Sequence, residues 1–131
     1  MSNEDREKYL SVALRIVGLI YIFGIFALMR LMTPSWSWEP RQPEYEQMIV
    51  GVYATLGVFL FLAAKQPRKN ASLIWFTIWS NVVHAGIMLV QALRDPVEVP
   101  NLYGDVPALF LVAAVLWYLM PRGESAATSA S

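Results

Sequence analysis

Polar side chains recur along one apolar stretch of the chain, residues 73–93, at a spacing that would place them on one face of a helix. His84, the only histidine of the chain, lies in this row. An imidazole at such a position can carry a proton, ligate a metal or bind the central ion of a porphyrin-type pigment. At intervals of three, four and three residues, the members of the row are Asn81, His84, Met88 and Gln91.

Three interpretations of this polar row follow from its chemistry. The favoured one is that Asn81, His84 and Gln91 form hydrogen bonds between helices, each contributing about 1 kcal/mol. The second is a site or path for a proton or a substrate. The third is a metal or a pigment, which is less favoured because one histidine without a second histidine or a cysteine is a poor metal site. We therefore expect no metal and no cofactor, with haem or another pigment at His84 as the remaining alternative.

A second set of polar groups belongs to the stretch 48–64. Tyr53 adds a hydroxyl group to the candidate intramembrane polar site of Asn81, His84 and Gln91. Its neighbours are small residues that allow another helix to approach closely, so we favour packing over binding for this surface. These neighbours are Gly51, Ala54, Thr55 and Gly57.

Charged residues near the predicted outer ends of the helices form a second candidate site. They are able to form a charged outer vestibule that binds a polar ligand or joins one loop to another through ion pairs. Solvated loop charge with local pairing is the simpler interpretation, since exposed ion pairs contribute little. The members of this outer vestibule are Arg30, Arg41, Glu44, Glu46, Arg94 and Asp105.

Four apolar stretches must position these side chains, and they fill almost the whole chain: residues 12–31, 48–64, 73–93 and 106–120. A helix that crosses about 30 Å of hydrocarbon needs roughly 20 mostly apolar residues. Only 15% of the residues are charged, against about 25% in an average soluble domain. We predict an all-α fold, an integral membrane four-helix bundle with up-down-up-down topology. Its single membrane domain, 1–131, has helices at about 10–32, 44–64, 72–93 and 105–120 and a flexible tail at 123–131.

The distribution of basic residues predicts the orientation of this bundle. The positive-inside rule counts lysine and arginine in short loops and ignores acidic residues. Seven basic residues fall on the side that would hold both termini, and three fall on the other side. We therefore predict a multi-pass protein of the cell (inner) membrane with both termini in the cytoplasm. The seven are Arg6, Lys8, Arg15, Lys65, Arg68, Lys69 and Arg122, and the three are Arg30, Arg41 and Arg94.

Composition also excludes several classes of function. The net charge is zero and no basic patch carries interleaved aromatic residues, which argues against a nucleic-acid partner. The chain contains no cysteine, which excludes disulfides, thiol catalysis and cysteine-ligated zinc. No spaced His and Glu motif, nucleophile–base pair or phosphate loop is visible, so we lean against an enzyme.

Several segments together resemble a family of small bacterial four-helix membrane proteins of unknown function. The segments are 38–48 (WEPRQPEYEQM), 51–57 (GVYATLG), 72–76 (SLIWF) and 79–91, which contains His84. By size and hydropathy the chain is also distantly similar to DoxX-like four-helix proteins. The resemblance implies no known reaction, so no catalytic residue is carried over. It implies that chemistry specific to the family would lie at Glu44 and Glu46 of the outer loop and on the face with Asn81, His84 and Gln91.

Three functions are compatible with these observations. The favoured one is a non-enzymatic accessory or scaffold subunit that packs in the lipid bilayer against a larger membrane complex or against its own copies. The second is a homo-oligomeric transporter or channel, in which Asn81, His84 and Gln91 line the path. The third is a redox partner that binds a quinone or a pigment near His84 and Tyr53.

Overall fold

The computed structural model of the chain describes residues 1–24, 27 and 43–123. The described part is helical and contains no strand, which confirms the all-α class predicted from the sequence. The elements, in chain order, are α1 (Asn3–Leu19), a π-helical turn η1 (Ile20–Gly24), α3 (Pro43–Ala63), a 3-10 turn η2 (Pro67–Asn70), α4 (Ala71–Arg94), a 3-10 segment η3 (Pro96–Tyr103) and α5 (Asp105–Leu119).

Local sequence explains where these helices begin and end. Ser2 caps α1, because its hydroxyl oxygen accepts a hydrogen bond of 3.2 Å from the backbone N–H of Asp5. Asp95 ends α4 in extended backbone and caps η3 through a hydrogen bond of 3.0 Å from the N–H of Val97. Met120 is extended at the end of α5, as expected for a residue that precedes proline, here Pro121.

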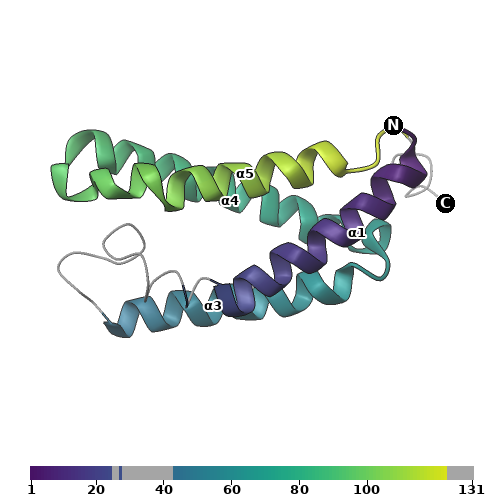
Figure 1. Cartoon of the computed structure of the whole chain (residues 1–131), viewed down its shortest axis with the longest axis horizontal. Coiled ribbons are helices and arrows are strands. Elements are labelled where there is room, and N and C mark those ends of the chain that lie inside the picture. Colours follow the sequence, from purple (N-terminus) through teal and green to yellow (C-terminus); the bar gives the residue numbers. More distant parts are fainter. Residues whose placement is uncertain (25–26, 28–42, 124–131) are drawn as a thin grey trace.

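The helices form two antiparallel pairs, α1 with α3 and α4 with α5 (Figure 1). The pairs come together at the end that carries the N-terminus, where α1 also contacts α5. There Asn3 exchanges two hydrogen bonds with the backbone of Arg122, of 2.9 and 3.1 Å. The Ser11 hydroxyl donates a third, of 2.6 Å, to the carbonyl oxygen of Ala64 just after α3. Asn3 and Ser11 thus link α1 to the segments that follow α5 and α3.

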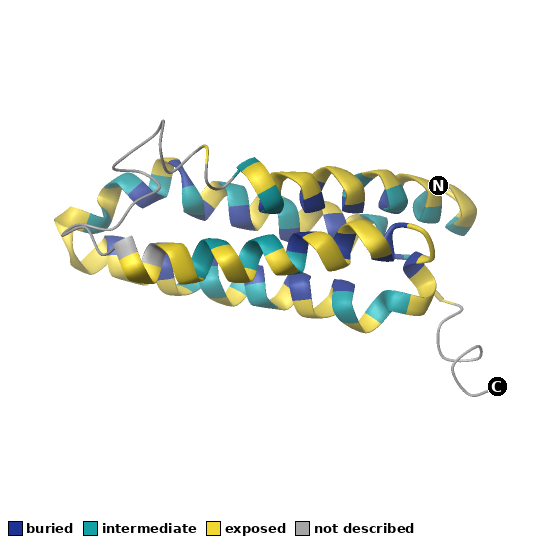
Figure 2. Ribbon diagram, turned by 90° about the horizontal axis from the view of Figure 1, so that it is seen from below, coloured by how far each residue is buried: buried dark blue, intermediate teal, exposed yellow. Residues whose placement is uncertain are grey.

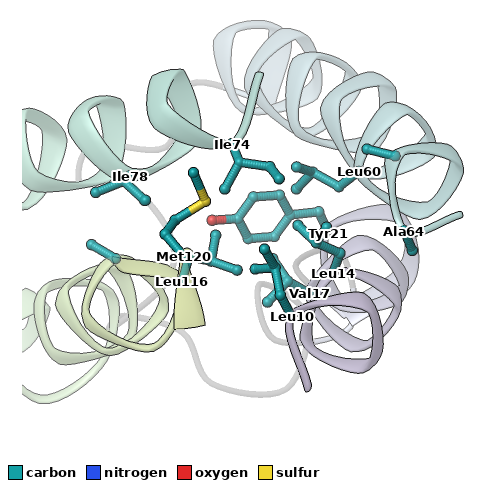
Figure 3. Packing of buried hydrophobic residues seen from close by; sticks show 12 residues of the cluster. Leu10, Leu14, Val17, Tyr21, Leu60, Ala64, Ile74, Ile78, Leu116 and Met120 are labelled. Atoms are coloured by element: carbon teal, nitrogen blue, oxygen red, sulfur yellow. The ribbon is translucent and has the colours of Figure 1, made fainter. Parts of the chain in front are cut away.

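A hydrophobic core fills the space between α1 and its neighbours at this end. The Tyr21 ring lies in the middle of this cluster (Figure 3). Along α1 and η1, the buried side chains of Leu10, Leu14, Val17 and Tyr21 follow a four-three-four spacing. This spacing turns one face of the helix toward the core. The largest fully buried apolar side chains are Leu10, Leu14, Leu60, Ile74 and Leu116.

α1 and α3 cross at two glycines. A Cβ atom added to Gly57 would lie 2.6 Å from the carbonyl oxygen of Gly18, and one added to Gly18 would lie 2.7 Å from that of Gly57. The two backbones are therefore in direct contact, at a separation that only glycine allows. Gly51, on the same helix as Gly57, has no neighbour within 4 Å of such a Cβ. Of the two glycines in the close-packing surface predicted for residues 51–57, only Gly57 makes such a close approach.

The outer faces of α3, α4 and α5 are largely apolar, and α1 exposes both charged and apolar side chains. Exposed residues cover the outside of the helical fold, and buried residues face its interior (Figure 2). A helix that is apolar all round belongs inside a large protein or a membrane. Among the large hydrophobic residues that are exposed are Val12 and Ile16 of α1, Val52, Phe59 and Leu62 of α3, Trp75, Phe76, Trp79, Val83 and Ile87 of α4, and Leu111 and Trp117 of α5.

One helical segment among the described residues, Pro67–Arg94, is long and apolar enough to cross a membrane. A second candidate arises if Pro96–Tyr103 and Asp105–Leu119, which meet at a bend of 41°, count as one span. The apolar part of α3, Gln47–Ala63, is shorter. By length and composition, one or two helices are thus able to cross a membrane.

Candidate functional site

Two side chains that are 31 residues apart in the sequence meet between α3 and α4. The Tyr53 hydroxyl oxygen lies 2.6 Å from Nδ1 of His84, and the centroids of the two rings are 6.1 Å apart. Both side chains are half-buried. The hydrogen bond therefore links the two helix pairs through side chains, at a place where α3 and α4 themselves approach each other less closely than do the helices within each pair.

A second hydrogen bond lies next to the first, between Asn81 and Tyr21. The Asn81 side-chain amide donates to the Tyr21 hydroxyl oxygen over 2.7 Å, and both residues are buried. The Tyr21 and Tyr53 rings meet edge to face, with centroids 5.0 Å apart and an angle of 88° between their planes, which is a favourable geometry for two aromatic rings. Tyr21, Tyr53, Asn81 and His84 thus form one connected group, which we name the polar cluster.

Tyr21 of this cluster belongs to the π-helical turn η1. Such a turn inserts an extra residue into a helix and changes which face the following side chains occupy, and it often occurs at functional sites. Tyr21 is not among the site residues predicted from the sequence. A signal was nevertheless present: Tyr21 continues the row of Leu10, Leu14 and Val17 at four-three-four spacing.

A groove of about 350 Å³ lies beside the polar cluster, between α3 and α4. Its size is at the lower end of the range of small-molecule sites, roughly 300–1,000 Å³. Three residues bring polar groups to a wall that is otherwise apolar: Tyr53, Ser80 and His84. The groove is open to the outer surface, where Val52 and Phe76 of its wall are exposed. The remaining lining residues are Met48, Ile49 and Leu56.

The Ser80 hydroxyl is engaged within its own helix. It donates a hydrogen bond of 3.2 Å to the carbonyl oxygen of Thr77, and the Thr77 hydroxyl donates one of 2.9 Å to the carbonyl of Leu73. Ser80 therefore offers the groove the lone pairs of its oxygen and not a proton.

The structure separates the members of the predicted polar row. Asn81 and His84 join the polar cluster with Tyr53. Met88 is buried in a second small apolar cluster, with Ala85 of α4 and two residues of α5. Gln91 is exposed and is not among the residues that line the groove. The row thus contributes two residues to one site, and the rest of it lies elsewhere.

The predicted outer vestibule falls only partly within the described residues. Glu44 and Arg94 are exposed, and Asp105 is half-buried at the start of α5. Arg30 and Arg41, and the side chain of Glu46, lie outside the described part of the chain.

Metal ligation finds no support in residues 1–24, 27 and 43–123. No three His, Cys, Asp or Glu residues within this part of the chain come together in a way that would hold a metal ion. The polar cluster itself offers an imidazole and a phenol, which form hydrogen bonds and exchange protons.

Comparison of the sequence with protein families gives a match over almost its whole length. Residues 5–129 match the Family of unknown function (DUF6632). The chain belongs to this family. No curated protein and no solved structure matches it. The family assigns no reaction to the site, and the expected likeness to bacterial and DoxX-like proteins stays a prediction.

Proposed function

We propose that this chain is an integral membrane protein that binds a small lipophilic molecule in the groove between α3 and α4. The observation that carries the proposal is the hydrogen bond between Tyr53 and His84 in the wall of an apolar groove that opens onto an apolar surface. A ligand would reach the groove from the lipid phase and place a polar group at His84. The role is that of a binding module, alone or as an accessory subunit of a larger membrane complex.

The apolar exterior supports a membrane location. Within Pro67–Arg94, 33% of the most apolar 18-residue stretch is buried inside the fold. The core helix of a soluble protein would be mostly buried. Lipid is the environment in which the remaining apolar side chains are stable. Trp75 and Trp79 are exposed in the first part of α4 and Trp117 is exposed near the end of α5, as expected for an aromatic belt at a membrane surface.

The charge distribution supports an orientation with both termini in the cytoplasm of a cell (inner) membrane. Asn3 and Arg122 are hydrogen-bonded to each other, so the described ends of the chain lie on one side of the fold. Basic residues of η2 lie on this same side, where Arg68 forms an ion pair of 2.7 Å with Glu7. The positive-inside rule assigns such a side to the cytoplasm.

A comparison between the two hydrogen-bonded pairs favours binding over interhelical packing for His84. Tyr21 and Asn81 are 3% and 1% exposed, as expected of a pair that serves only to join helices. Tyr53 and His84 are half-buried and line an open groove. An ionisable side chain at membrane depth is costly and marks a functional site by default. The accessible pair is therefore the one suited to a ligand.

The homo-oligomeric transporter and the scaffold without a ligand find less support. A transport path along Asn81, His84 and Gln91 would need these side chains on one open face, but Asn81 is buried against Tyr21 and Gln91 lies apart from the groove. A pure scaffold would have no need of a polar pair in an open groove. A quinone or a pigment remains within the proposal, as one kind of lipophilic ligand.

Native mass spectrometry of the protein released from nanodiscs or mild detergent tests the proposal. We expect a small lipophilic molecule to remain bound to the wild-type chain. Val52→Trp places an indole in the groove and should abolish this retention. Val58→Trp is the matched control, because Val58 is an exposed valine of the same helix that does not line the groove.

Three outcomes would contradict or narrow the proposal. A chain that retains and takes up no lipophile refutes it, as does equal retention by the two tryptophan variants. An absorbance spectrum of the purified protein without a Soret or chlorin band excludes the pigment as the ligand. The mass of the complex also reports oligomers and partner subunits, and a monomer without partners would contradict the accessory-subunit role.

A further inference from the structure

We propose that the groove selects a ligand whose polar head is a hydrogen-bond acceptor, such as the carbonyl group of a ketone or a quinone, held by the Nε2–H group of His84. This inference rests on the proposed binding function and names the chemistry that the ligand must carry. It follows from the direction of the hydrogen bond between Tyr53 and His84.

A neutral imidazole has one nitrogen that donates and one that accepts. At Nδ1, the partner of His84 is a phenol. A phenol is a good donor and a weak acceptor, while the bare nitrogen of an imidazole is a strong acceptor, so the favourable arrangement has Tyr53 donating to Nδ1. The ring proton of His84 then resides on Nε2, because the hydrogen bond at one nitrogen determines the protonation of the other.

The remainder of the polar cluster holds Tyr53 in the position that this arrangement requires. The Tyr53 ring packs edge to face on Tyr21 at 5.0 Å, and Tyr21 is itself held through its hydroxyl oxygen by Asn81 at 2.7 Å. Both of these supporting residues are buried. Tyr21 and Asn81 are therefore positioning residues, which act on the ligand through Tyr53 and His84.

Among the described residues that line the groove, the other hydroxyl protons are already engaged. In the arrangement inferred above, the Tyr53 proton is engaged with Nδ1 of His84, and the Ser80 proton goes to the carbonyl oxygen of Thr77. His84 lines the groove, and in this arrangement its Nε2–H is the side-chain donor that we assign to a ligand. In an apolar surrounding a donor without a partner is unfavourable. A ligand with an acceptor head satisfies it, and a hydrocarbon of the same shape leaves it unpaired.

The tautomer of His84 is directly measurable, because the chain has only one histidine. In protein labelled with nitrogen-15 and held in nanodiscs at a pH at which the ring is neutral, the ring nitrogen shifts identify which atom carries the proton. We expect the Nε2–H form in the wild-type protein and a mixture of both forms in Tyr53→Phe. A proton on Nδ1 in the wild-type protein would refute the inference, whatever the groove binds.

Ligand selectivity is tested with two probes of matched shape, octanophenone and octylbenzene, which differ by a carbonyl group. The carbonyl stretch of octanophenone should move to lower frequency in nanodiscs that contain the wild-type protein, relative to empty nanodiscs. His84→Phe should remove this shift and weaken octanophenone binding roughly tenfold, with octylbenzene unchanged. Tyr53→Phe should weaken octanophenone about twofold, since the competent tautomer is then only partly populated.

The outcomes separate this inference from the proposed function. If neither probe binds the wild-type protein and no other lipophile is retained, the binding function itself fails. If both probes bind with equal affinity and the carbonyl stretch stays at its value in empty nanodiscs, the groove binds lipophiles but the inference is wrong. The infrared result on the wild-type protein decides the matter even if His84→Phe does not fold.

Discussion

The contact between Gly18 and Gly57 gives the sharpest prediction about what holds the site together. In Gly57→Ala the new Cβ atom would lie 2.6 Å from the carbonyl oxygen of Gly18 and 3.0 Å from the Cβ atom of Tyr21. Ordinary van der Waals contact begins near 3.4 Å. The difference, 3.4 − 2.6, requires α1 and α3 to separate by about 0.8 Å.

The cost of this separation follows from two opposing terms. Overpacking a close contact costs about 1–3 kcal/mol, and the upper end applies here because backbone meets backbone. Alanine in place of glycine within a helix stabilises the helix by about 1 kcal/mol. We expect Gly57→Ala to lower the free energy of unfolding by about 2 kcal/mol. Gly51→Ala, where the added Cβ atom meets nothing, should raise it by up to about 1 kcal/mol.

The assay is unfolding in mixed micelles by titration with sodium dodecyl sulfate, followed through tryptophan fluorescence. The two alanine variants should differ by about 3 kcal/mol in the free energy of unfolding. Since the separation also moves Tyr21 away from Tyr53, the nitrogen-15 spectrum of His84 should change in Gly57→Ala and stay as in the wild type in Gly51→Ala. Equal unfolding midpoints for the two variants would refute the close crossing.

Two further predictions concern the core and the buried hydrogen bond, both measured by the same titration. Leu116→Ala should lower the free energy of unfolding by about 2–5 kcal/mol, because Leu116 is fully buried. Leu111→Ala, at an exposed position of the same helix, should lower it by less than about 1 kcal/mol. Equal losses in the two variants would contradict the packing. Asn81→Leu should cost about 1–3 kcal/mol because it leaves the buried Tyr21 hydroxyl without its partner. Adding Tyr21→Phe should recover part of that loss, and strictly additive costs would indicate that the two residues do not interact.

Much of the helical architecture could be predicted from local sequence. Apolar stretches interrupted by prolines are enough to predict an all-α chain, because proline lacks the backbone donor and restricts the residue before it. Asn81 and His84 were also recognisable as candidate residues, since a polar side chain in an apolar helix is conspicuous by itself. Their partners were harder to recognise. Tyr53 is a member of the candidate site predicted from the sequence, although packing is favoured for the surface around it, and Tyr21 is not among the predicted site residues.

The reason is that each partner lies far away in the sequence. Tyr53 and His84 are 31 residues apart, and Tyr21 and Asn81 are 60 apart. Which tyrosine meets which polar residue depends on the rotation of each helix about its axis relative to its neighbours. Helical periodicity defines the faces of one helix, but it carries no information about the face of the next helix that lies opposite.

By itself, the sequence determined that this chain is helical and apolar and that its stretch 73–93 carries a row of polar groups. These properties depend on residue type and local spacing, which a sequence records directly. Only the tertiary structure decided that Tyr53 bonds to His84 in an open groove while Asn81 is closed off against Tyr21. That distinction depends on the backbone contact between Gly18 and Gly57 and on the relative rotation of the helices, which arise only when separate helices pack together.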